Sequence, residues 1–101
     1  MKEITKAQED VLKAIWEAGT GAVSDILEKL PEPRPAYTTV ATVIKVLERK
    51  GYVAHRTYGK THVYNALVSR KDYADNLIRD AYTGFFNSSL NQLVSPFIKN
   101  K

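Results

Sequence analysis

The segment Thr38–Val46 constrains the fold more than any other, because seven of its nine residues are β-branched. Such side chains are stiff at χ1 and favour strands. Its apolar residues do not alternate as those of a half-buried strand do; Val40 and Ile44, together with Leu47 just after the segment, recur at helical spacing. We therefore predict a helix over residues 38–50 whose weak propensity is offset by tertiary packing.

The opposite side of this predicted helix is short and polar. Thr38, Thr42 and Lys45 follow one another at helical spacing, and Arg49 lies one turn further. The major groove of B-DNA admits a helix whose outer side is not bulky, and threonine offers a hydroxyl and a methyl to base edges. We predict a DNA-reading helix with the contact residues Tyr37, Thr38, Thr39, Thr42, Lys45 and Arg49. Two alternatives stay open: the threonines pack or cap the helix, with Thr38 as its N-cap, and Tyr37 is a core or hinge aromatic.

Charge is distributed unevenly along the chain. Residues 34–71 contain eight basic residues and a single acid, Glu48, so this segment carries a net charge of +7, whereas the rest of the chain carries −3. A basic segment between acidic flanks is typical of a surface that faces a polyanion. A solvated positive surface without a partner is the alternative.

Two further helices precede the predicted reading helix. Residues 5–17 have apolar residues at helical spacing after a capping pattern, Thr5-x-x-Gln8. Residues 22–30 show the same spacing over a shorter helix. The sequence PEPRP, residues 31–35, cannot continue a helix and is predicted to be a stiff connector.

A hairpin follows the reading helix. The runs YVAHRTY and THVYNAL are rich in Val, Thr and Tyr, and a two-residue loop at Gly59-Lys60 would pair Tyr58 with Thr61. Side chains near this loop are predicted to contact DNA phosphates; they are Arg56, Tyr58, Lys60 and His62. The alternative is a solvated, charged tip that protects the sheet edge from aggregation.

The C-terminal third is predicted to form two helices. Ser69-x-x-Asp72 is a capping pattern that opens the first, and residues 87–89 (Asn-Ser-Ser) end it before a short last helix. These helices carry more aromatic surface than a small domain can bury, so we expect a partner there. The order of elements predicts a mainly α fold with a small β-hairpin: a winged helix-turn-helix over residues 1–68, followed by a helical region over residues 69–101.

Catalytic and metal chemistry find no support in the sequence. The chain has no cysteine, no Gly-rich phosphate loop and no paired-carboxylate spacing, and its only histidines are His55 and His62. We predict no enzymatic activity, metal site or cofactor, and a structural or solvated role for His55.

Without an 18-residue apolar run or a leader peptide, we expect a cytoplasmic protein with no membrane span. A protein-binding adaptor is the alternative to DNA binding, although the basic threonine side argues against it.

Four stretches together resemble the BlaI/MecI/CopY family, the penicillinase-repressor class of bacterial regulators. They are TKAQEDVLKAIWEAG, VSDILEKLPEPRPAYTTVATVIKVLERKGYV, GKTHVYNALVSRKDY and FFNSSLNQLVSPF, and they cover most of the chain. The second stretch is the specific one, because a proline-rich run into Tyr-Thr-Thr-Val, followed by a Lys-Gly-Tyr-Val turn, is not a general winged-helix feature.

The resemblance implies a homodimeric transcriptional repressor on a palindromic double-stranded operator, controlling β-lactam-resistance or related genes. It implies pairing of the protomers through Tyr73, Leu77, Ile78, Ala81, Phe85, Phe86, Leu90, Leu93, Val94 and Phe97. Copper-responsive members carry a C-terminal cysteine cluster, which this chain lacks. β-Lactam-responsive members are inactivated through a sensor protease; the corresponding place lies near residues 95–97, where Pro96 departs from the family pattern. Members usually add a further helix after this point, so we expect a dimer interface that is smaller, or differently built, than in the family.

Overall fold

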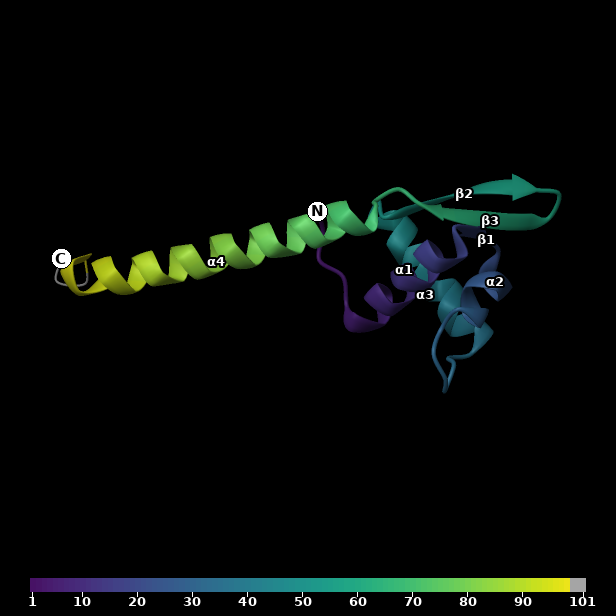
Figure 1. Cartoon of the computed structure of the whole chain (residues 1–101), viewed down its shortest axis with the longest axis horizontal. Coiled ribbons are helices and arrows are strands. Elements are labelled where there is room, and N and C mark those ends of the chain that lie inside the picture. Colours follow the sequence, from purple (N-terminus) through teal and green to yellow (C-terminus); the bar gives the residue numbers. More distant parts are fainter. Residues whose placement is uncertain (99–101) are drawn as a thin grey trace. The chain divides into compact units, whose positions relative to one another are not determined.

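The computed structural model describes the backbone of residues 1–98 and the side chains of residues 1–89. The chain divides into two compact units, Met1–Ser69 and Arg70–Lys101, and each is described by itself. In chain order the elements are α1 (Lys6–Ala18), β1 (Thr20–Gly21), α2 (Val23–Glu28), α3 (Tyr37–Arg49), β2 (Val53–Tyr58), β3 (Thr61–Ala66) and α4 (Arg70–Ile98) (Figure 1). The predicted order of three helices, a hairpin and a C-terminal helical region is thus confirmed.

The core of the first unit lies where α1, α2 and α3 pack together against the sheet. Its largest fully buried side chains are Leu12, Ile15, Ile26, Val40, Ile44, Leu47 and Val53. Three of these come from α3, the helix predicted from the β-branched segment. Burial of a Val, Leu or Ile side chain is worth about 1.5–3 kcal/mol, which outweighs the few tenths of a kcal/mol that each β-branched residue loses in a helix.

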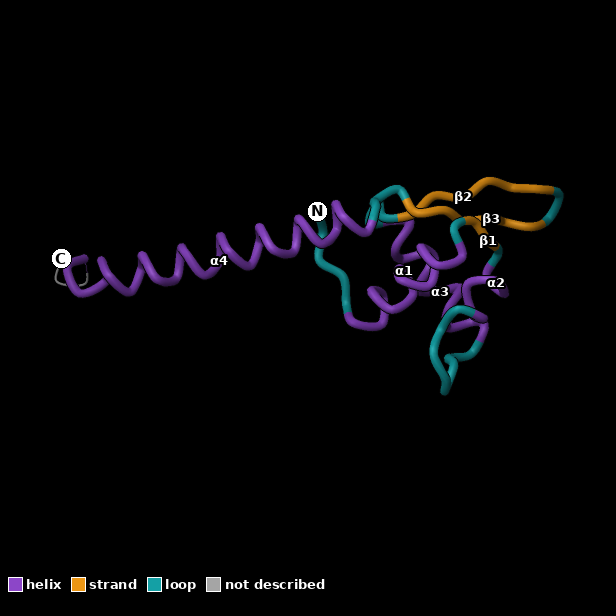
Figure 2. The backbone as a smooth tube through the Cα atoms, in the orientation of Figure 1, coloured by secondary structure: helices purple, strands orange, loops and turns teal. Residues whose placement is uncertain are grey.

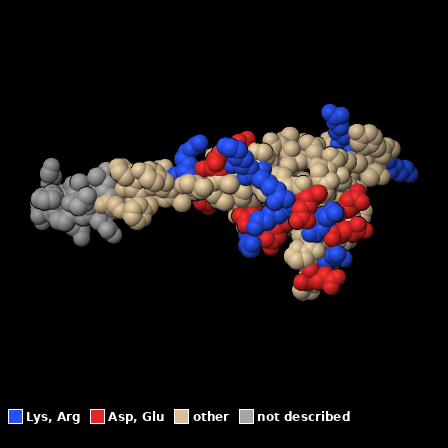
Figure 3. Space-filling view, in the orientation of Figure 1, with Lys and Arg blue, Asp and Glu red and all other residues tan. Residues whose placement is uncertain are grey.

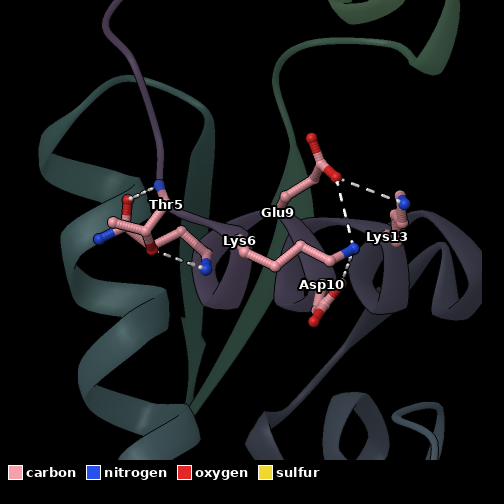
Figure 4. Close-up of polar contacts among 6 residues, drawn as sticks. Thr5, Lys6, Glu9, Asp10 and Lys13 are labelled. Atoms are coloured by element: carbon pink, nitrogen blue, oxygen red, sulfur yellow. Dashed lines mark hydrogen bonds and ion pairs between the residues drawn. The ribbon is translucent and has the colours of Figure 1, made fainter.

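The start of α1 follows the predicted capping pattern. The Thr5 hydroxyl accepts a hydrogen bond from the Gln8 backbone N–H at 3.2 Å, and the Gln8 amide oxygen accepts from the Thr5 N–H at 3.0 Å. The Lys6 ammonium lies 3.0 Å from the carboxylate of Asp10, one turn further along α1 (Figure 4). The hydrogen bond and the charge of Asp10 raise the pKa of Lys6. Glu9 completes the surface network between Lys6 and Lys13.

The sheet has three antiparallel strands in the order β1-β3-β2 (Figure 2). Tyr58 pairs with Thr61, so the predicted two-residue loop is confirmed. Gly59 has a φ of +62°, as the first loop position of a type II′ turn requires, and glycine adopts it without strain. The short strand β1 was not predicted, because two residues are too few to show a periodic pattern.

Side chains from distant parts of the chain hold the hairpin and the N-terminal segment to the helices. The Trp16 indole N–H donates to the Val68 carbonyl at 2.8 Å, which joins α1 to the end of the hairpin. The Lys50 ammonium donates to the Glu3 carbonyl and to the Gln8 amide oxygen, both at 2.9 Å. The end of α3 therefore anchors the residues that precede α1.

The second unit contains one continuous helix, α4, of 29 residues. The predicted break at residues 87–89 is wrong. Asn and Ser have only modestly lower helix propensity than Ala, so three of them do not outweigh the cooperativity of a long helix. No helix in the described part of the chain is long and apolar enough to cross a bilayer.

We predict that Ile44→Ala lowers the free energy of unfolding by about 2–5 kcal/mol, because it leaves a cavity beside fully buried neighbours. The neighbouring substitution Lys45→Ala, on the exposed side of the same helix, should change it by less than about 0.5 kcal/mol. Urea unfolding followed by circular dichroism at one protein concentration measures both. Equal losses in the two variants would contradict the assigned packing of α3.

Candidate nucleic-acid interface

The two sides of α3 differ sharply in burial. Val40, Ile44 and Leu47 are fully buried. The threonine face, which we define as Thr38, Thr39, Thr42, Lys45 and Arg49, is exposed at every position. Tyr37, at the start of the helix, is 54% exposed and is therefore not a core aromatic. The helix thus presents short hydroxyl side chains and two cations to solvent, as the sequence predicted.

The threonines of α3 do not cap the helix. Its N-cap is Ala36, one residue before Tyr37, so the alternative of Thr38 as N-cap is wrong. The Thr42 hydroxyl donates to the Thr38 carbonyl at 3.0 Å. Because this bond uses its hydrogen, the hydroxyl oxygen stays available as an acceptor, which suits the amino groups of adenine and cytosine in a major groove.

The wing, which we define as residues 53–66, distributes its predicted contact residues over both faces of the hairpin. His55 pairs with Tyr64, and Thr57 pairs with His62. Because strand side chains alternate, His62 shares one face with His55 and Tyr64, and Arg56 and Tyr58 lie on the other. Lys60 is in the loop. The sequence grouped these residues by their distance from Gly59; the register separates them.

The face of the wing that carries His62 adjoins α3. A hollow of about 690 Å³ is lined by Lys45, Glu48, Arg49, His55, His62 and Tyr64. A second hollow, of about 310 Å³, brings Lys60 and His62 together with Tyr37 and Lys45. Arg56 and Tyr58 instead line a separate hollow on the other face with Thr20 and Asn65. Lys45 and Arg49 of the threonine face therefore belong with His62 and Lys60 to one concave, cationic surface. Thr39 lines a separate hollow with Pro33 and Val43.

One acid lies on this cationic surface. The Glu48 carboxylate is 2.6 Å from His55 Nδ1, and each side chain is 31% exposed. The His55 ring stacks on that of His62, with centroids 4.3 Å apart and planes within 10°. Sequence reasoning missed this pair, although Glu48 as the single acid between residues 34 and 71 was a signal that pointed to it.

The outer end of the wing carries basic side chains. Figure 3 shows Lys and Arg at this end of the hairpin, whereas the acidic side chains in the same view lie over the helices and the connector after α2, interspersed with Lys and Arg. Burial, and then the charge of Glu48, raise the pKa of the Tyr64 hydroxyl. This phenol therefore stays neutral beside the basic side chains of the site. In the described part of the chain, no three His, Asp or Glu side chains are placed to hold a metal ion.

The helix α4 carries a second surface of interest, made of apolar side chains. Leu77, Ile78, Phe85 and Phe86 are all exposed, whereas Tyr73 is buried and Ala81 is exposed but small. Tyr82 was not among the predicted contact residues, yet it is 68% exposed and stacks on Phe86 with ring centroids 6.4 Å apart. The side chains of the remaining predicted contact residues, Leu90, Leu93, Val94 and Phe97, lie outside the described residues.

The chain is similar to known regulators over most of its length. The model of a family described as penicillinase repressor matches residues 4–101. The penicillinase repressor of Bacillus licheniformis is 25% identical, over 97% of this chain and 77% of that protein. The methicillin resistance regulatory protein MecI of Mammaliicoccus sciuri is 30% identical, over 98% of this chain and 81% of that protein.

Solved structures show the same fold. The CopR repressor is 26% identical with a TM-score of 0.54, over 67% of this chain and 100% of that chain. Bordetella bronchiseptica BpsR, whose DNA binding is regulated by 6-hydroxynicotinic acid, has a TM-score of 0.58 at 18% identity, which is a likeness of fold alone. The match covers 89% of this chain and 62% of the BpsR chain, which is less than two thirds of the length of BpsR. The winged-helix prediction is confirmed by these neighbours.

We predict that two lysines of the concave surface act differently on duplex DNA. Lys45→Ala should change which bases are preferred, with a loss of about 1–3 kcal/mol at the positions it contacts. Lys60→Ala, in the hairpin loop, should weaken binding to all sequences alike and reduce the salt slope by about one per protomer. Selection from a random duplex pool, followed by titration at several salt concentrations, measures both. An altered base preference in Lys60→Ala would contradict the role given to the loop.

Proposed function

Because this chain belongs to the penicillinase repressor family, we propose that it represses transcription by binding a palindromic operator in double-stranded DNA as a homodimer. The observation that carries the proposal is the exposed threonine face of α3 beside a cationic wing. A helix with such a face fits the major groove, while the wing contacts flanking phosphates. A protein-binding adaptor would not need this combination of short side chains and positive charge.

The dimer proposal rests on the apolar surface of α4. Leu77 and Phe85 lie eight residues apart on one row of the helix, and Ile78, Tyr82 and Phe86 form the row beside it. Contiguous exposed apolar surface of this kind marks an interaction site. A second copy of the chain is the simplest partner, because twofold symmetry lets the same rows cover each other. Two reading helices related by that symmetry match the two halves of a palindrome.

The names of the relatives support a proposal for the regulated genes and for an inactivating partner. The similar proteins are named for repression of penicillinase and for regulation of methicillin resistance. We propose β-lactam-resistance or related genes as targets, and a sensor protease as the inactivating partner. Cleavage near residues 95–97 would shorten α4 and weaken the dimer, which would release the operator.

The first test of this function is the salt dependence of binding. A dimer that neutralises roughly 6–10 phosphates should give a plot of log K against log salt with a slope of about −5 to −9. Fluorescence anisotropy with a labelled duplex from the chain's own upstream DNA provides the measurement. A slope near zero would exclude DNA as the ligand of the concave surface.

The second test concerns the dimer. The double substitution Phe85→Ser/Phe86→Ser should weaken self-association at least ~100-fold, because burial of each Phe is worth about 1.5–3 kcal/mol and both protomers lose it. Thr83→Ser, on the same exposed stretch of α4, is the matched control. Sedimentation equilibrium gives the association constant, and the same titration as above gives operator affinity. A double variant that stays dimeric would remove the α4 rows from the interface.

A further inference from the structure

We propose that Glu48 is a positioning residue for sequence-specific DNA binding: it fixes the ring of His55, and His55 fixes the ring of His62 on the side of the wing that adjoins α3. The proposal rests on the proposed function and adds a residue that contacts no DNA. It explains why the one acid of the basic segment lies among the residues that line the concave surface.

The first link is the contact between Glu48 and His55. Nδ1 of His55 and a carboxylate oxygen of Glu48 are 2.6 Å apart, which is a short hydrogen bond. A carboxylate only accepts hydrogen bonds, so Nδ1 of His55 carries the hydrogen and the ring orientation is set. Glu48 comes from the last turn of α3 and His55 from β2, so the bond ties the reading helix to the wing.

The second link is the stack between His55 and His62. Register makes His62 a diagonal neighbour of His55 across the two strands, within reach of a ring. The rings are nearly parallel at 4.3 Å, and Tyr64 lies against both, at 5.5 Å from His55 and 6.3 Å from His62. His62 is exposed, so without this stack its side chain would have free rotamers.

The charge of Glu48 does not by itself favour DNA binding. A carboxylate beside Lys45 and Arg49 lowers the positive potential of a surface that faces phosphates, so by charge alone it weakens binding to any DNA. A residue that reduces general affinity while it orders the wing relative to the reading helix raises the ratio of specific to non-specific binding. That ratio, rather than affinity, is therefore the quantity that Glu48 is expected to control.

The test measures affinity for two duplexes: one selected by the wild-type chain from a random pool, and a scrambled duplex of the same composition. Glu48→Ala should bind the scrambled duplex about 2–3-fold more tightly and the selected one at least ~5-fold more weakly, so that the ratio falls about tenfold. Glu48→Gln still accepts the His55 hydrogen bond and should keep the ratio within about twofold of wild type. Glu17→Ala removes an exposed acid from α1 and controls for net charge. If Glu48→Ala tightens both duplexes equally, the proposal is wrong.

A double-mutant cycle tests whether Glu48 acts through His55. His55→Phe keeps a ring that stacks on His62 but loses the bond to Glu48, so it should lower the ratio about as much as Glu48→Ala does. In the His55→Phe background, Glu48→Ala should have no further effect on the ratio. If the losses of the two single variants add in the double variant, the proposal is wrong. An unchanged ratio in His55→Phe alone would also overturn it, and this result can be obtained even if Glu48→Ala fails to fold. A wild-type chain that does not distinguish the two duplexes would instead refute the proposed function.

Discussion

The first unit depends on the burial of the aliphatic side of α3 against α1 and α2. Val40, Ile44 and Leu47 are fully buried there, and their packing compensates for the weak helix propensity of the segment. The same packing fixes the rotation of α3 about its axis. Because the aliphatic side is inward, Thr39 and Thr42 are necessarily outward, and the exposed threonine face is a consequence of the core.

The register of the hairpin is the second constraint, because it decides what the wing adds to α3. Pairing of His55 with Tyr64 places His62 on the side of the reading helix. A slip of one residue would exchange the two faces and bring Arg56 to that side instead. The Trp16 bond to Val68 holds the base of the hairpin to α1, and the Glu48 bond to His55 holds its middle to α3. The concave surface is thus assembled from α3 and the two strands of the hairpin, which follow it directly in the chain.

Much of this arrangement was predictable from the sequence, and the exceptions have physical reasons. Periodicity identified α1 and α3 because core burial imposes it, and it also identified the threonine face. The break predicted at residues 87–89 was wrong, because the preferences of Asn and Ser are weak beside helix cooperativity. The division of the wing residues between two faces follows from the predicted pairing of Tyr58 with Thr61, although the residues were first grouped by their distance from Gly59. The bond from Glu48 to His55 depends on tertiary contact, which spacing along the chain does not encode.

The central claim is that the threonine face of α3 lies in the major groove, and dimethyl sulfate footprinting of the bound selected duplex tests it most directly. This reagent methylates guanine at N7, which is exposed only in the major groove. We expect protected N7 positions in two clusters centred about ten base pairs apart, one for each reading helix of a dimer. Full occupancy of the duplex with every guanine N7 still reactive would contradict the claim.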